Sequence, residues 1–230
     1  MPGQVELRRD GNVAVIVVDN PPVNALSHDV RAGLIEAFTR ARDDAAVEAI
    51  VLTAAGRTFI AGADITEFDK PPTAPTLVDV IALIDSIGKP VVAAVHGTPL
   101  GGGLEVTLGC HFRVSAPGTR LGLPEIKLGL IPGAGGTQRL PRLVGMEKAA
   151  QMILTGNPIA AADARAAGLI DEIVEGDIAA AGIAFARKLL AEQRPLRRVR
   201  DREDKLAAQL HEFFALALEV GGDDLVEGFR

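Results

Sequence analysis

The stretch that decides the fold reads Val91-Val92-Ala93-Ala94-Val95-His96-Gly97-Thr98-Pro99-Leu100-Gly101-Gly102-Gly103-Leu104-Glu105-Val106-Thr107-Leu108-Gly109. Its first five residues are all apolar, as in a strand that is buried on both faces of a sheet. A glycine-rich turn follows, and a short apolar segment that we interpret as a buried helix then runs to Gly109. The order strand, turn, helix is one unit of an α/β fold.

The same alternation continues on both sides of this stretch. Apolar, β-branched runs predict further strands over 13–18, 49–53 and 112–115. Amphipathic spacing predicts helices over 28–42, 77–87, 147–154, 160–167, 177–191 and 201–219. The sequence therefore predicts an α/β core over 1–175 and a C-terminal helical region over 176–230 that belongs to the same functional unit.

Composition argues against several classes of protein. The chain has 230 residues, of which 48% are hydrophobic and 23% charged, so a single buried core is feasible. A net charge of −6 and the absence of Trp and Tyr make a nucleic-acid partner a poor first guess. No apolar run approaches the length of a membrane span, and the N-terminus has no secretory pattern. We expect a cytoplasmic protein.

Cysteine and histidine give no sign of a metal site. Cys110 is the single cysteine, so an internal disulfide is excluded and a small buried hydrophobe is its simplest role. The four histidines are scattered without zinc-ligand spacing, and His96 and His111 are interpreted as structural. The arginine-rich stretch 194–202 is most simply a solvated face; a contact to a phosphate group is the alternative.

Two glycine-rich stretches are candidates for phosphate loops. Residues 96–103 follow a strand but lack the Gly-Lys-Ser/Thr ending of a P-loop. Residues 133–138 begin like a dinucleotide fingerprint, yet Gln138 occupies the third glycine position and Pro132 stands where a strand should precede. Nucleotide-phosphate chemistry is therefore disfavoured.

Glycine also lets backbone N–H groups approach a ligand oxygen. Gly102 is predicted at the start of the short helix, where N–H groups are unpaired and the helix dipole is positive. The small-residue stretch 59–64 could present a second N–H, and two such groups would form an oxyanion hole. The alternative is that both stretches are tight turns without a functional role.

Two glutamates stand in apolar surroundings. Glu105 is flanked by Leu104 and Val106, and Glu125 lies between Pro124 and Ile126. Burial raises the pKa of a carboxyl group toward values that suit proton transfer, so the pair could act as general acid and general base. Alternatively, each glutamate caps a helix or forms an ion pair, for which Lys127 is near Glu125.

These motifs together resemble the crotonase (enoyl-CoA hydratase/isomerase) superfamily. The matching segments, in the family's order, are Pro21-Pro22-Val23-Asn24-Ala25-Leu26, residues 59–64, Lys89-Pro90-Val91, residues 97–105, Leu123-Pro124-Glu125, residues 132–140 and Leu169-Ile170-Asp171. The resemblance implies a spiral of ββα units followed by a C-terminal helical extension. The sequence Cys110-His111-Phe112-Arg113 is more similar to the hydratase domain of multifunctional β-oxidation enzymes than to most stand-alone hydratases.

The resemblance also implies roles for particular residues. The N–H groups of Ala63 and Gly102 would form the oxyanion hole, and Glu105 and Glu125 would be the catalytic acids. The substrate, an acyl-CoA, would contact Ala61, Ala63, Asp64, Ile65, Thr66, Gly102 and Gly133. No metal or redox cofactor is expected, since the thioester itself accepts the electron pair. Coenzyme A is part of the substrate and not a cofactor. A homo-oligomer, a trimer or hexamer, is the expected assembly.

The implied reaction is addition of water to trans-2-enoyl-CoA, giving 3-hydroxyacyl-CoA in fatty-acid β-oxidation. Family members with other reactions usually change one or both glutamates, so retention of both favours a hydratase. The alternatives within the family are a Δ3–Δ2-enoyl-CoA isomerase or a thioesterase-like acyl-CoA enzyme. From a different class of protein, the alternative is a catalytically silent acyl-CoA-binding subunit.

Overall fold

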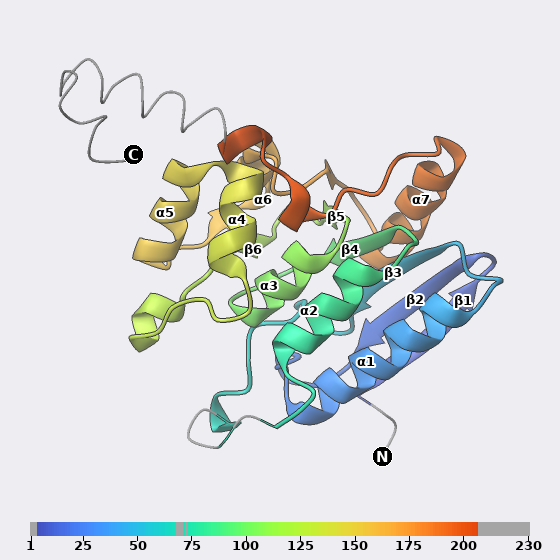
Figure 1. The fold of residues 1–230 in the computed structure, drawn as a ribbon, viewed down its shortest axis with the longest axis horizontal. Coiled ribbons are helices and arrows are strands. Elements are labelled where there is room, and N and C mark those ends of the chain that lie inside the picture. The colour runs from blue at the N-terminus through green and yellow to red at the C-terminus, as the bar shows by residue number, and fades with distance from the viewer. Residues whose placement is uncertain (1–3, 68–70, 72, 207–230) are drawn as a thin grey trace, which may run out of the picture.

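A six-stranded sheet forms the centre of the protein (Figure 1). The computed structural model describes residues 4–67, 71 and 73–206. The sheet has the strand order β1-β2-β3-β4-β5-β8, and a small antiparallel pair, β6-β7, lies apart from it. The strands are β1 (Val5–Asp10), β2 (Val13–Val18), β3 (Ala49–Ala54), β4 (Val91–Val95), β5 (Phe112–Ser115), β6 (Arg120–Leu121), β7 (Ile159–Ala160) and β8 (Glu172–Ile173).

Helices cover both faces of the sheet. They are α1 (His28–Asp43), α2 (Leu77–Ser86), α3 (Gly102–Gly109), α4 (Gly136–Val144), α5 (Met146–Thr155), α6 (Ala161–Ala167) and α7 (Ile178–Ala191), with short 3₁₀ turns η1 (Ile65–Glu67), η2 (Glu125–Leu128) and η3 (Val199–Asp201). Figure 1 shows α1, α2 and α3 side by side across one face of the sheet. The α/β fold class is confirmed.

Successive side chains of a strand point to opposite faces of the sheet, so neighbouring residues pack against different helices. In β3, Ile50 and Leu52 point into the core that holds α1 to α3, whereas Val51 points to the opposite face. There it packs with Phe185 and Leu189 of α7. A strand buried on both faces presents no side chain to solvent, which is why β2 and β4 are continuous apolar runs. Because α7 packs on the sheet, this helix of the predicted C-terminal region shares the core.

Among the elements that were not predicted are β1, α4 and the two-residue strands β6, β7 and β8. The strand β1 pairs antiparallel with β2, and because it is an edge strand with mostly exposed residues it lacks an apolar run. The helix α4 begins directly after the glycine-rich stretch 133–135 and contains Pro141, so its sequence does not resemble a helix. Most of the predicted helix over 201–219 lies outside the described residues.

The arginine-rich stretch 194–202 is not simply a solvated face, and that interpretation was wrong. The guanidinium group of Arg197 lies 4.9 Å from the ring centroid of Phe112 and pairs with Asp171. Arg198 donates from Nε to the carbonyl oxygen of Asp85 over 2.7 Å. These side chains attach the segment after α7 to the rest of the protein, which a count of charges along the sequence does not reveal.

Strands β2 to β5 are parallel, so their carboxyl ends lie at one edge of the sheet. Loops leaving that edge carry Leu26 after β2, Ala63 after β3 and Gly101 after β4. In open parallel sheets, ligands bind at the carboxyl ends of the strands. The topology therefore brings the small-residue stretches 59–64 and 97–103 together at the carboxyl edge of the sheet, where a ligand site is expected.

Candidate active site

The loops after β2, β3 and β4 are joined by backbone contacts. Leu26 N–H donates to the carbonyl oxygen of Gly62 over 2.9 Å, and Leu26 and Ala63 form an isolated parallel bridge. Leu100 N–H donates to Ile60 O over 3.3 Å. A Cβ atom at Gly103 would overlap this carbonyl group, so only glycine permits the approach. These contacts fix the relative positions of the three loops around Ala63.

The N–H groups of Ala63 and Gly102 lie in the same small region. Gly102 is the first residue of α3, and a Cβ atom on it would be 3.6 Å from the nitrogen of Ala63. Within the described residues, neither N–H group donates to a protein acceptor. Two N–H donors without a partner, one of them at the positive end of a helix, can both donate hydrogen bonds to one negatively charged oxygen.

Glu105 lies in the first turn of α3 and is only 3% exposed. Its Oε1 accepts hydrogen bonds from Ala134 N–H over 2.7 Å and from Gly136 N–H over 2.9 Å. Burial raises the pKa of Glu105, while these N–H groups and the charge of Arg139 oppose that increase. Glu105 thus also caps the N-terminus of α4, which favours its ionised form.

Glu125 is the first residue of η2, and its carboxyl group lies over Gly101. A Cβ atom at Gly101 would be 3.2 Å from Oε1 of Glu125 and 3.9 Å from the Cα of Gly62. Burial and, to a smaller extent, the negative charge of Glu105 together raise the pKa of Glu125 to about 7. Its Oε2 is buried and has no hydrogen-bond partner within the described residues. Lys127 donates instead to Asn157, so the suggested ion pair with Glu125 does not form.

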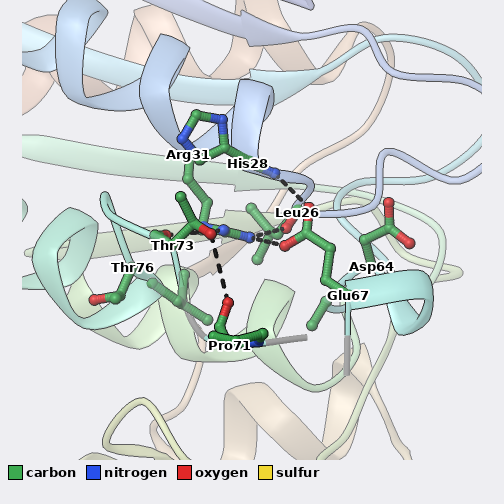
Figure 2. Close-up of a pocket in the computed structure, with 10 residues that line it drawn as sticks. Leu26, His28, Arg31, Asp64, Glu67, Pro71, Thr73 and Thr76 are labelled. Carbon is green, nitrogen blue, oxygen red and sulfur yellow. Dashed lines mark hydrogen bonds and ion pairs between the residues drawn. The ribbon is translucent and has the colours of Figure 1, made fainter. Parts of the chain in front are cut away.

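A cavity of about 460 Å³ opens beside Ala63 (Figure 2). Its lining residues are Leu26, His28, Arg31, Ala63, Asp64, Glu67, Pro71, Thr73, Thr76 and Leu77. Leu26 and Leu77, which line the cavity, are also the side chains nearest to a Cβ atom built on Gly102, so the cavity lies next to the start of α3. Figure 2 shows Arg31 extending from α1 to Glu67, with which it forms an ion pair of 2.8 Å.

The residues predicted to contact substrate are only partly brought together. Ala63 and Asp64 line the cavity, whereas Ala61, Ile65 and Thr66 do not, and Ile65 is 69% exposed. Gly133 is exposed in the loop before α4, next in sequence to Ala134. That any of these residues contacts a substrate stays a prediction.

Sequence reasoning missed the residues that hold Glu105. Ala134 and Gly136 supply its N–H donors, and Arg139 supplies a nearby positive charge. The signal in the sequence that could have indicated these donors is the glycine-rich stretch 133–136 at the start of α4. By sequence alone, this stretch is interpreted only as a possible nucleotide-binding motif. That stretch instead binds a carboxylate of the same chain, using the same property of a helix N-terminus.

Two features of the described residues bear on other classes of function. No group of three or more His, Cys, Asp or Glu side chains in 4–67, 71 and 73–206 is arranged to hold a metal ion. No helix in that part of the chain combines the length and apolar character needed to cross a membrane.

Known proteins resemble this chain along most of its length. The family model "Enoyl-CoA hydratase/isomerase" matches residues 8–215. The "Peroxisomal bifunctional enzyme" of Danio rerio is 43% identical over 188 residues, which are 82% of this chain and 26% of that protein. A "Glyoxysomal fatty acid beta-oxidation multifunctional protein" of Cucumis sativus is 43% identical over 227 residues, 93% of this chain and 31% of that protein. The chain thus spans about a quarter to a third of these relatives.

Shorter relatives and solved structures agree with this assignment. A "Probable enoyl-CoA hydratase" of Bacillus subtilis (strain 168) is 43% identical over 173 residues, 72% of this chain and 67% of that protein. The crystal structure of an enoyl-CoA hydratase from Bacillus anthracis superposes with a TM-score of 0.76 at 33% identity, covering 82% of this chain and 77% of that one. Fold and site together define an α/β protein in which two partly or fully buried glutamates lie near two unbonded N–H groups. The chain belongs to the enoyl-CoA hydratase/isomerase family, and the expected crotonase-like fold is confirmed.

Proposed function

We propose that this chain adds water across the double bond of a trans-2-enoyl-CoA to give a 3-hydroxyacyl-CoA, a step of fatty-acid β-oxidation. The observation that carries the proposal is the unequal environment of two neighbouring glutamates. Glu105 accepts two backbone N–H groups, whereas burial and the charge of Glu105 raise the pKa of Glu125 to about 7. Two carboxyl groups whose pKa values are separated by their surroundings can divide the roles of base and acid.

The proposed mechanism assigns one task to each group. The thioester carbonyl oxygen binds between the N–H groups of Ala63 and Gly102, which stabilise the negative charge that develops there. The Glu105 carboxylate takes a proton from water as its oxygen bonds to C3, and the electron pair of the C2–C3 bond moves toward the carbonyl. The protonated Glu125 then donates its proton to C2. Proton transfer from Glu105 to Glu125 restores the resting enzyme.

The proposal needs no resident metal or redox group, because the thioester itself accepts the electron pair and no oxidation occurs. The negative charge is carried by an enolate oxygen, for which two N–H donors are sufficient. The cavity beside Ala63 is the proposed entry for the coenzyme A portion, with Asp64 on its lining.

The direct test is the ultraviolet absorbance of crotonyl-CoA. Purified protein should abolish the band of the conjugated thioester, with rates linear in enzyme concentration, and mass spectrometry should show a product heavier by one water. An unchanged spectrum, together with measurable binding of crotonyl-CoA, would favour a silent acyl-CoA-binding subunit.

A second activity is Δ3–Δ2 isomerisation of enoyl-CoA. It is favoured by the position of Glu125 over Gly101, because one carboxyl group there could move a proton between C2 and C4. This reaction consumes no water. It is tested with a 3-enoyl-CoA substrate, from which the conjugated band should appear before it is consumed by hydration.

The proposed assembly is a homo-oligomer, a trimer or hexamer. Its support is an exposed apolar patch formed by Ile126, Leu128, Leu130 and Ile131, together with Leu154 of α5, which packs beside η2. Apolar patches of this kind on a protein surface mark interaction sites. Light scattering behind gel filtration should give three or six times the mass of one chain.

The proposed compartment is the cytoplasm, where a buried free thiol such as Cys110 remains reduced. The relatives from Danio rerio and Cucumis sativus are named peroxisomal and glyoxysomal. Cell fractionation with an antibody to the chain separates these locations.

A further inference from the structure

A buried ion pair lies behind the proposed base. Arg139 of α4 pairs through Nη2 with Oδ2 of Asp85, which lies near the C-terminal end of α2. The side chain of Asp85 is 1% exposed and that of Arg139 14% exposed. Oδ1 of Asp85 and Nε of Arg139 are buried without a hydrogen-bond partner within the described residues. Burying two charges is costly, so the pair calls for a role beyond stability.

The pair is connected to Glu105 through the backbone. Arg139 N–H donates to Gly135 O over 2.9 Å, and a Cβ atom at Gly135 would overlap the guanidinium group of Arg139. The side chain of Arg139 therefore folds back over Gly135. Gly135 stands between Ala134 and Gly136, the two residues whose N–H groups bind Oε1 of Glu105.

Asp85 is itself held from a third segment. Arg198 donates from Nε to Asp85 O over 2.7 Å and from Nη2 to Ile87 O over 3.5 Å. The end of α2 is thereby fixed between α4 and the segment before η3. The position of Arg139 over Gly135 therefore depends both on α4, which carries Arg139, and on the end of α2, where Asp85 is held by Arg198.

Few other charges surround Glu105. The charged and titratable groups on α2 and α4, the main helices that pack against α3, and on η2 are Asp79, Asp85, Arg139, Arg142, Glu125 and Lys127. Asp79 is exposed in the capping box of α2, Lys127 bonds to Asn157 at the surface, and the partly buried Arg142 bonds to Gln138 O. Arg139 is the positive group whose charge acts on Glu105.

We propose that Arg139 and Asp85 are positioning residues: their ion pair fixes the N-terminus of α4 over Glu105 and sets the electric field at its carboxylate. The inference rests on the proposed role of Glu105 as the base. Arg139 stabilises the negative charge of Glu105, and Asp85 reduces that effect by partly neutralising Arg139. Removing one or the other must therefore change the acidity of Glu105 in opposite directions.

The experiment compares the pH dependence of crotonyl-CoA hydration in matched variants. Asp85→Asn keeps the shape and an acceptor for Arg139, so the acid limb of kcat/KM should move to lower pH. Arg139→Gln removes the positive charge, and the limb should move to higher pH. Arg139→Lys keeps the charge and should leave the limb near that of the wild type. Arg142→Gln, which removes a partly buried arginine from the same helix whose charge does not act on Glu105, should not move it.

Purely structural damage would lower kcat in both Asp85→Asn and Arg139→Gln without shifting their acid limbs apart. Limbs that move in the same direction, or not at all, would overturn the inference. Arg139→Gln leaves Asp85 buried and unpaired, which threatens folding. The double variant Asp85→Asn/Arg139→Gln avoids this, and its limb should still lie above that of the wild type because Arg139 exerts the larger effect on Glu105.

A second readout does not require activity. Carbon-13 NMR of glutamate side-chain carboxyl groups, with the Glu105 signal assigned by its loss in Glu105→Gln, follows the titration of Glu105 directly. Its midpoint should move down in Asp85→Asn and up in Arg139→Gln. If wild-type protein fails to hydrate crotonyl-CoA, the proposed function fails, while this titration still decides whether Arg139 and Asp85 control Glu105.

Discussion

Oε1 of Glu105 accepts two backbone N–H groups at the start of α4, whereas Oε2 of its neighbour Glu125 is buried with no partner in the described part of the chain. The two carboxyl groups interact, because the charge of Glu105 raises the pKa of Glu125. Hydrogen bonds stabilise an ionised carboxylate, whereas burial of a carboxyl oxygen without a partner favours the protonated form. In the proposed mechanism, this asymmetry assigns Glu105 as the base and Glu125 as the acid.

Replacement of each glutamate by glutamine separates the two roles. Glu125→Gln should lose hydration and isomerisation together, because both reactions use its proton. Glu105→Gln should lose hydration but retain part of the isomerase activity, which needs no water. Each loss should be about 10²–10⁴-fold, and the double variant should be far from additive. Crotonyl-CoA and a 3-enoyl-CoA are the assay substrates; equal, mild losses in both single variants would indicate structural carboxyl groups.

Glu125 should control the alkaline side of the pH profile. Its proton is required at C2, and its pKa is raised to about 7, so kcat/KM should fall as the pH rises through about 7. A profile that stays flat to pH 9 in the free enzyme would contradict the assignment of Glu125 as the acid.

The same group should affect stability. Its pKa in the folded state is about 7, above the ordinary value of 4.5, so the folded protein binds this proton more tightly than the unfolded chain. The Glu125 contribution to stability is therefore present below about pH 4.5 and is lost as the pH rises through 7. Glu125→Gln should unfold at a higher temperature than wild type at pH 8 and at an equal temperature at pH 4.5, as measured by circular dichroism.

A side chain at Gly102 should damage the oxyanion hole. The Cβ atom of Gly102→Val would be 2.9 Å from Cδ2 of Leu77 and 3.1 Å from Cδ1 of Leu26, which displaces the N–H group at the start of α3. Loss of one oxyanion donor typically costs about 10²–10³ in kcat. The matched control is Gly88→Val, because a Cβ atom there meets nothing within 4 Å. A folded Gly102→Val protein with wild-type turnover would remove Gly102 from the mechanism.

His111 should be a structural residue that is neutral in the folded state. Val91 N–H donates to its Nδ1 over 3.1 Å, and burial with the charges of Arg198 and Arg113 lowers its pKa to about 4. Because this pKa is below the ordinary 6.5, the His111 contribution to stability is present above pH 6.5 and is lost as the pH falls to 4. His111→Leu should cost about 1–3 kcal/mol of unfolding free energy at pH 7 and weaken this pH dependence. Urea unfolding between pH 4 and 7 measures both effects.

Hydration should survive exhaustive chelation and desalting, because the proposed steps use only side chains, N–H groups and the thioester. The measurement is the rate of crotonyl-CoA hydration before and after treatment with EDTA and gel filtration. Activity that disappears and returns with added zinc or NAD would contradict the proposed mechanism.

Local sequence patterns were sufficient for the central strands and most of the helices, and they singled out the two glutamates that we propose as catalytic acids. The apolar runs of β2 and β4 and the amphipathic spacing of α1 depend on burial of neighbouring residues, which the sequence records directly. A glutamate between apolar residues is likewise visible without a structure. Gly102, at the start of the helix that carries Glu105, was recognised for the same reason.

Only the tertiary structure decided how each acid is tuned. The N–H donors of Glu105 are 29 and 31 positions away in the sequence, and Arg139 meets Asp85 across 54 positions. Such pairs depend on how α2, α3 and α4 pack, and no local period encodes a contact between distant segments. In the sequence, the glycines before α4 resemble an incomplete nucleotide-binding motif. In the structure, the N–H groups of this stretch bind the carboxylate of Glu105. Sequence determined which groups could carry protons here, and packing determined the surroundings that shift the pKa of each one, because the free energy of a charge depends on everything that surrounds it.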